Sequence, residues 1–202
     1  MNNDITSKLK KMGIFTGEDT AREGRYRVMR YIKDDTKFGH ADDYGNITTP
    51  IIYDYVEPFF DGMAVVKKNG KFGYVNLNGK LVIPLVYDSA RSFSSNRAGV
   101  IINDKAGHID NIGNITTPFI YDDTSHFYKS RAKVFLDNKI GYVNLDGELV
   151  IPAIFDDGEN FSNTNIISVR IKKNKLNINK DGYPSSLKER NILFNAIFKS
   201  KI

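Results

Sequence analysis

An aromatic residue followed by aspartate recurs through the chain at a constant spacing of 34 residues. The four pairs are Tyr53-Asp54, Tyr87-Asp88, Tyr121-Asp122 and Phe155-Asp156, with further carboxylates nearby at Glu57, Asp123, Asp157 and Glu159. A row of carboxylates beside aromatic rings suits a cationic protein surface, because aromatic anchors and complementary charge are typical of protein interfaces. The same pattern arises when each aspartate caps a turn while each ring packs between repeats. Both interpretations hold together if the rings are buried and the carboxylates exposed.

Two histidines stand where the alternate copies of the same pattern carry tyrosine. His40 and His108 replace Tyr74 and Tyr142, and an aspartate follows each histidine two residues later. On a strand, the histidine and the aspartate would share a face, which is one requirement of a divalent metal site. Two ligands per copy are too few for such a site. The sequence therefore predicts packed or solvent-facing histidines, with no metal.

Motifs of catalysis are absent from the sequence. It has no glycine-rich phosphate loop before a helix, no nucleophile elbow and no metalloprotease helix. Its one serine-rich patch, Ser92, Ser94 and Ser95, lies where the repeat needs a loop. We therefore expect no catalytic residue and no cofactor, and we expect the protein not to be an enzyme.

The elements that must position these residues are repeats of 34 residues. Three series of markers keep this spacing: Pro50, Pro84, Pro118 and Pro152; Gly39, Gly73, Gly107 and Gly141; Gly45, Gly79, Gly113 and Gly147. In the clearest copy, strand-like runs near 63–67, 72–77 and 80–83 are separated by Asn69-Gly70 and Asn78-Gly79, and Asn-Gly favours hairpin turns. A second periodicity of 68 residues makes alternate copies the most alike.

These repeats predict an all-β tandem array of about five three-stranded β-meanders, open and solenoid-like. A small propeller is the alternative, with a fourth strand between Tyr87 and Phe93 in each copy. We assign residues 1–27 to an N-terminal segment, 28–184 to the array and 185–202 to an amphipathic helix that Ser185 or Ser186 could cap. This helix covers the open end of the sheet or, as the alternative, binds a partner or a membrane surface. The apolar stripe expected on that helix is Leu187, Ile192, Leu193, Phe194, Ile197 and Phe198.

Composition and charge narrow the class of protein further. The chain has no cysteine, no segment that reads as a signal peptide and no apolar run long enough to span a membrane, so we expect a cytoplasmic protein. Its net charge of +5 conceals a division. Residues 34–162 carry 12 basic and 18 acidic side chains, whereas residues 163–202 carry 9 basic and 2 acidic ones. The acidic array makes nucleic acid an unsuitable ligand for it.

The string at residues 70–84, followed by Tyr87-Asp88 and Phe93, resembles the bacterial WG β-repeat family. The likeness extends over about residues 28–184. The tryptophan positions of the family hold Phe38, Phe72, Ala106 and Ile140 here. The resemblance implies an all-β tandem array with a binding role and no shared catalytic residues.

The expected function is therefore non-catalytic binding of a cationic protein through the acidic and aromatic row. One concrete form is an immunity protein that neutralises a basic toxin, such as a nuclease. The alternative is a module that binds nucleic acid or a cell-surface glycan.

Overall fold

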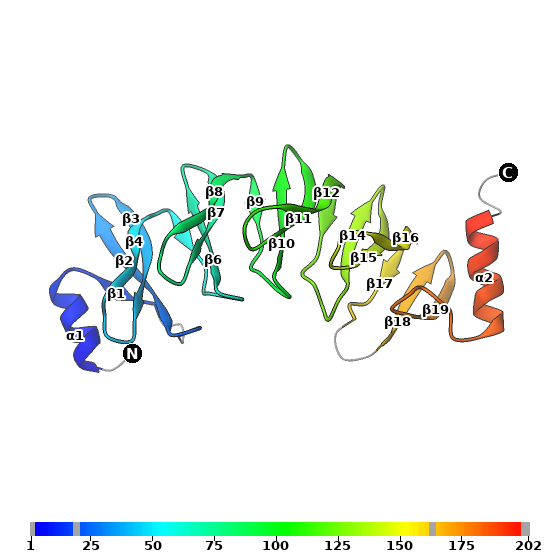
Figure 1. The fold of residues 1–202 in the computed structure, drawn as a ribbon, viewed down its shortest axis with the longest axis horizontal. Coiled ribbons are helices and arrows are strands. Elements are labelled where there is room, and N and C mark those ends of the chain that lie inside the picture. Colours follow the sequence, from blue (N-terminus) through cyan, green and yellow to red (C-terminus); the bar gives the residue numbers. More distant parts are fainter. Residues whose placement is uncertain (1–2, 18–20, 162–164, 199–202) are drawn as a thin grey trace.

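The computed structural model describes residues 3–17, 21–161 and 165–198. Five small antiparallel sheets follow one another along the long axis of the molecule, and the two ends of the chain lie at opposite ends of that axis (Figure 1). Because the first and last sheets are far apart, the array is open. The predicted all-β tandem array is confirmed, and the propeller alternative is excluded.

Each sheet defines one unit of the array. Unit 1 contains β1 (Phe15–Thr16), β2 (Arg25–Ile32), β3 (Asp35–Asp42) and β4 (Ile47–Tyr53); unit 2 contains β5 (Tyr55–Val56), β6 (Met63–Lys68), β7 (Lys71–Asn76) and β8 (Leu81–Tyr87). Unit 3 contains β9 (Ser89–Ala90), β10 (Arg97–Ile102), β11 (Lys105–Asp110) and β12 (Ile115–Tyr121). Unit 4 contains β13 (Asp123–Thr124), β14 (Ala132–Leu136), β15 (Lys139–Val143) and β16 (Leu149–Phe155), and unit 5 contains β17 (Asp157–Gly158), β18 (Ile166–Ile171) and β19 (Asn174–Asn179).

A two-residue strand begins every unit, so four of the five sheets have four strands rather than the three expected. In unit 3 this strand is β9, and it lies in the segment between Tyr87 and Phe93 where a fourth strand was considered. It directly follows the aspartate of the preceding unit and pairs with β10. The array also begins earlier than residue 28, because β1 starts at Phe15 within the segment assigned to the N-terminus.

The two Asn-Gly turns of unit 2 differ in kind. Asn69 and Gly70 both adopt positive φ, of 52° and 81°, and close the two-residue hairpin between β6 and β7 as predicted. At the second turn only Gly79 has positive φ, and the Asn76 side chain accepts the backbone N–H groups of Asn78 and Lys80. The second turn is therefore an asparagine-capped turn.

Close approach of the backbone explains the Gly39, Gly73, Gly107 and Gly141 series. The last long strand of each of the first four units has irregular register opposite the glycine. A Cβ atom on Gly73 would lie 2.6 Å from the carbonyl oxygen of Ile83. A Cβ atom on any of the three equivalent glycines would lie 2.4–2.8 Å from a backbone carbonyl oxygen. Only glycine fits under the bulged strand.

The apolar cores lie between units. Units 2 and 3 share one buried cluster that includes Tyr74 and Ile83 from unit 2 and Phe93 from unit 3. Units 4 and 5 share another, around Tyr142 and Ile151. The clusters at the other two junctions have fewer buried members. Each unit therefore completes its core with its neighbour, as in other repeat proteins.

The 68-residue periodicity corresponds to two alternating kinds of junction. At the junctions between units 2 and 3 and between units 4 and 5, Tyr74 and Tyr142 donate their hydroxyl protons to a carbonyl oxygen of the next unit, at 2.8 Å. At the junctions between units 1 and 2 and between units 3 and 4, the Nε2 atoms of His40 and His108 lie 2.9 Å and 3.0 Å from the equivalent carbonyls.

The residue opposite each of these histidine and tyrosine rings, on the adjacent strand of the same sheet, depends on which of the two rings is present. Nδ1 of His40 lies 3.0 Å from the Thr49 hydroxyl, and His108 bonds Thr117 in the same way. The tyrosines face Ile83 and Ile151 at these positions. Because a carbonyl can only accept, Nε2 of each histidine carries the proton and Nδ1 accepts from threonine. Histidine pairs with threonine, and tyrosine pairs with isoleucine.

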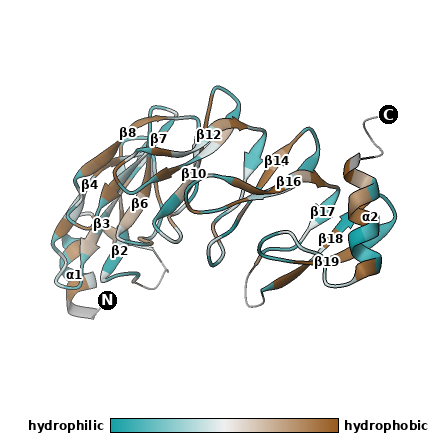
Figure 2. Cartoon of the chain, turned by 45° about the vertical axis from the view of Figure 1, so that its right-hand side comes forward, coloured by the Kyte–Doolittle hydropathy of each residue, from teal (hydrophilic) through white to brown (hydrophobic). Residues whose placement is uncertain are grey.

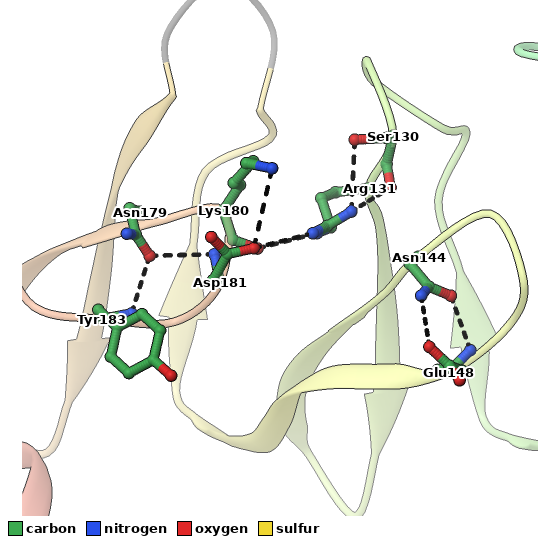
Figure 3. Close-up of polar contacts among 8 residues, drawn as sticks. All are labelled: Ser130, Arg131, Asn144, Glu148, Asn179, Lys180, Asp181 and Tyr183. Carbon is green, nitrogen blue, oxygen red and sulfur yellow. Dashed lines mark hydrogen bonds and ion pairs between the residues drawn. The ribbon is translucent and has the colours of Figure 1, made fainter.

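In three of the units, an arginine side chain also forms hydrogen bonds to the next unit. Arg131 of unit 4 donates through Nε to the carbonyl of Lys180 in the last turn of unit 5, at 2.8 Å, and pairs with Asp181 (Figure 3). Arg25 and Arg97 reach the equivalent turns of units 2 and 4. These bonds satisfy turn carbonyls that the sheets leave without a strand partner.

Helices cover both ends of the array. Leu9 of α1 (Asn3–Lys11) is buried against unit 1. α2 (Leu187–Phe198) begins with a capping box between Ser186 and Glu189, as the serine there predicts, and packs against unit 5. The expected apolar stripe is wrong in part, because Leu187 and Phe194 are mainly exposed while Ile192, Leu193 and Ala196 face the core. Figure 2 shows both hydrophilic and hydrophobic residues along α2.

Acid should weaken the two histidine junctions first. Burial lowers the pKa of His40 and of His108 from 6.5 to about 4. The unfolded chain therefore binds more protons, and stability that is complete above pH 6.5 is lost as the pH falls toward 4, by roughly 2–3 kcal/mol per histidine. We expect the urea concentration at the midpoint of unfolding to decrease as the pH is lowered from 6.5 to 4.5, a range above the pH at which the aspartates titrate.

The chain supplies the matched control for this experiment. The variant His40→Tyr/Thr49→Ile/His108→Tyr/Thr117→Ile installs the pairs already present in units 2 and 4. It should keep most of its stability at pH 4.5. An equal fall in both proteins would show that the histidines are not responsible.

Candidate binding groove

The structure places the four aromatic residues of the predicted ladder in the core. The rings of Tyr53, Tyr87, Tyr121 and Phe155 are between 1% and 7% exposed. Each ends the last long strand of its unit and lies opposite the residue that stands at the tryptophan position of the repeat. In unit 2, for example, Tyr87 lies opposite Phe72. The rings are therefore not available as surface anchors.

The four aspartates that follow these rings each join two units. One carboxylate oxygen of Asp54 accepts from Lys37 of unit 1 at 2.6 Å, and the other accepts from the backbone N–H of Asn69 in the hairpin of unit 2 at 2.8 Å. Asp88, Asp122 and Asp156 repeat both contacts, with Lys71, Lys105 and Lys139 as their lysines. We call this arrangement the aspartate clasp.

The clasp neutralises its own charge. The lysine hydrogen bond is the main cause that lowers the pKa of Asp54, Asp88, Asp122 and Asp156 below the usual value. The side chains are partly accessible, with Asp54 34% exposed. These contacts correspond to the turn-capping interpretation of the ladder, and binding of a partner by the same carboxylates stays a prediction.

The His-X-Asp triplets do not assemble a metal site. His40 is buried between units, whereas Asp42 accepts the backbone N–H groups of Tyr44 and Asn46 in an exposed turn. His108 and Asp110 separate in the same way. Within residues 3–17, 21–161 and 165–198, no group of three or more histidine, aspartate or glutamate side chains could hold a metal ion.

A groove lies on the segments that follow the clasp. A cavity of about 680 Å³ is lined by residues of segments 55–60, 89–94 and 126–128, which come from units 2, 3 and 4. A second cavity of about 630 Å³ shares Tyr55, Glu57 and Ala90 with it and extends to Lys67 and Phe72. We call these two cavities the central groove. A smaller hollow of about 350 Å³ occupies the corresponding segment of unit 5, beside Asp157 and Glu159.

The units differ from one another along this groove, whereas they agree in the clasp. The four residues at the first groove position are Tyr55, Ser89, Asp123 and Asp157. At the third position they are Glu57, Arg91, Ser125 and Glu159, and at the sixth position Phe60, Ser94 and Tyr128. Positions that vary among otherwise equivalent units give the groove a distinct chemistry at each step.

Hydrogen bonds fix the polar side chains of the central groove. Arg91 binds both carboxylate oxygens of Asp123, at 2.9 Å and 3.1 Å. The Ser92 hydroxyl donates to Glu57, and Nδ1 of His126 lies 3.1 Å from the backbone carbonyl of Ser92. The groove is therefore preorganised by contacts between neighbouring units.

The core holds the groove from beneath. The carbonyls that accept from His40, Tyr74, His108 and Tyr142 belong to Glu57, Arg91, Ser125 and Glu159, the third groove position of each unit. The junction residues therefore position the groove backbone.

Sequence reasoning found part of this groove. Of the carboxylates noted near the ladder, Glu57 lines the central groove and Asp123 binds Arg91, which does. Asp157 and Glu159 line the separate hollow of unit 5. Tyr55, Arg91, His126 and Tyr128 were missed. The signal that could have found them is their variation at fixed repeat positions next to an invariant aspartate.

Sheets of three or four antiparallel strands, repeated in an array that does not close on itself and joined to their neighbours by the aspartate clasp, define a β-repeat scaffold. Four consecutive segments, residues 41–72, 72–105, 107–139 and 140–175, match the family of the WG containing repeat. The chain belongs to this family.

Comparison with curated proteins gives no match. Among solved structures, a chain of the nidogen/laminin complex is 8% identical with a TM-score of 0.38, over 79% of this chain and 74% of that one. The tricorn protease is 11% identical with a TM-score of 0.30, over 85% of this chain and 20% of its own. A symmetrical protein from a study of de novo evolutionary emergence is 8% identical with a TM-score of 0.30, over 82% and 92%. Similarities this weak add nothing about function.

Neither helix, over the residues that the structure describes, is both long and apolar enough to cross a membrane.

Removing one clasp should lower stability. Asp54→Ala deletes the acceptor for Lys37 and for the Asn69 N–H group, and we expect a loss of about 1 kcal/mol in the free energy of unfolding. Urea unfolding at pH 7 measures it. Asp146→Ala is the control, because the exposed Asp146 side chain lies in a turn outside the clasp. Equal stability of the two variants would contradict a structural role for Asp54.

Proposed function

We propose that the protein is a non-catalytic scaffold that binds another protein through the central groove. The observation that carries the proposal is the contrast between two sets of residues. The aspartates that end the first four units are engaged in joining the units, whereas the open groove across three units is lined mainly by residues that differ from unit to unit. An extended surface of this kind suits a protein partner.

The partner that fits is cationic. The array from residue 34 to residue 162 has six more acidic than basic side chains. Within the groove, the guanidinium of Arg91 is paired with Asp123, so it does not offset the charge of Glu57. An acidic surface attracts a basic partner and raises its association rate at low salt.

One specific form of this function is inhibition of a basic toxin. Such a toxin, for example a nuclease, presents cationic side chains where the phosphates of its substrate bind. A protein that offers carboxylates and aromatic rings can cover those side chains. The acidic array supports this form of the proposal, in which the protein acts as an immunity protein.

The groove side chains can be replaced by residues that other units already carry at the same repeat positions. Tyr55→Ser, Glu57→Ser and Tyr128→Ser install the serines found at positions 89, 125 and 94. Because these residues are accommodated elsewhere in the array, we expect the triple variant to fold. In capture experiments from a native lysate at low salt, it should lose basic proteins that the wild-type protein and Asp146→Ala retain.

Three results would contradict the proposal. The first is that the triple variant captures the same proteins as the wild-type protein. The second is that capture is lost only when Lys172 and Lys173 are neutralised, as expected of a nucleic-acid ligand. Turnover of a substrate, abolished by one carboxylate substitution, would instead make the protein an enzyme. Inhibition of a captured toxin at one-to-one stoichiometry tests the specific form.

A further inference from the structure

Glu57 lies where the two cavities of the central groove meet, since it lines both. One carboxylate oxygen accepts from the Tyr55 hydroxyl at 3.3 Å, and the other accepts from the Ser92 hydroxyl. Both donors are neutral. They orient the carboxylate and form no ion pair with it, and Lys67, which lines the second cavity, lies over the Phe72 ring with its Nζ 4.8 Å from the ring centroid.

No cation of the described chain pairs with this carboxylate. The ion pairs within 4.0 Å among the described residues include the four clasp aspartates and Asp123, but none contains Glu57. The guanidinium of Arg91, which lines the same cavity, is bound to Asp123. A charge left in this state within a cavity is stabilised by a ligand cation.

Aromatic rings line the same cavity. Tyr55 and Tyr128 are 40% and 37% exposed, and Pro58 and Phe60 are among the apolar residues of the lining. One of these rings already binds a guanidinium of the chain, because Arg22 lies over Phe60 with its Cζ 4.3 Å from the ring centroid. Aromatic faces and a carboxylate together match the planar guanidinium group.

We propose that the central groove receives an arginine side chain of the partner, with its guanidinium paired to Glu57 and contacting Tyr55 and Tyr128. This inference rests on the proposed function and names the side chain that anchors the partner. The guanidinium forms charge-assisted hydrogen bonds to the carboxylate, and its aliphatic stem packs on the apolar lining.

The test uses N-acetyl-arginine amide as the probe, titrated into the ¹⁵N-labelled protein. Backbone amide signals of segments 55–60 and 89–94 should shift with saturation. The neutral isostere N-acetyl-citrulline amide should bind about tenfold more weakly, because it lacks the charge that Glu57 pairs with. N-acetyl-lysine amide should also bind more weakly than the arginine probe.

Two glutamates at the same repeat position give a matched pair of variants. Glu57→Gln should weaken the arginine probe about tenfold, whereas Glu159→Gln should leave its affinity unchanged. Tyr55→Ser should weaken it as well. If Glu57→Gln altered the amide spectrum as a whole, Glu57→Ser, which installs the residue of unit 4, replaces it.

Equal binding of the arginine and citrulline probes, or an unchanged affinity in Glu57→Gln, would overturn the inference. Equal binding of the lysine probe would overturn the assignment to arginine. The proposed function fails separately, when the triple groove variant still captures the basic proteins that the wild-type protein captures. Probe binding and partner capture therefore report on the two proposals independently.

Discussion

The aspartate that ends each of the first four units accepts hydrogen bonds from two successive sheets, and this contact determines how the sheets follow one another. At the first junction, Asp54 bonds Lys37 of its own unit and the hairpin N–H of Asn69 in the next. The chain continues from the aspartate directly into a two-residue strand that pairs with the following sheet. The position of the next unit is therefore set within three residues. Because the strand is interrupted at Asp54, the alternation of side chains shifts there: Tyr53 and Val56 face the core, whereas Tyr55 and Glu57 face the groove.

Two kinds of junction then alternate along the array, and they differ in what stabilises them. Tyr74 adds a large buried ring, packed edge-on against Phe93 with the ring centroids 4.9 Å apart, and Ile83 lies beside it in the shared core. His40 contributes a smaller ring whose two nitrogens must both be satisfied, one by Thr49 and one by the carbonyl of Glu57. A buried polar network of this kind is stable only when every member has a partner. Threonine and histidine therefore have to change together, which accounts for the 68-residue period.

The sequence was sufficient to predict the repeats, the hairpin at Asn69-Gly70 and the open all-β array, because glycine and asparagine mark positions where the backbone itself is constrained. It was not sufficient to tell whether the ladder residues make structural contacts between units or form an exposed binding surface. Periodicity cannot show whether a carboxylate such as Asp88 faces solvent or the hairpin of the next unit. The lysine that stands 17 residues before each ladder aspartate, such as Lys71 before Asp88, was a visible sign of an internal pair. The fourth strand was missed in the main prediction because two residues carry no periodicity.

The central groove depends on both kinds of junction. Tyr55, Glu57 and Ser92 come from units 2 and 3, which are joined through the apolar core around Tyr74. Tyr128 enters from unit 4, across the junction that contains His108. The backbone carbonyl of Glu57 also bonds to His40 at the junction of units 1 and 2, so both sides of the groove depend on a neutral histidine. Protonation of His40 and His108 would weaken these two junctions, whereas the apolar core around Tyr74 would still join units 2 and 3.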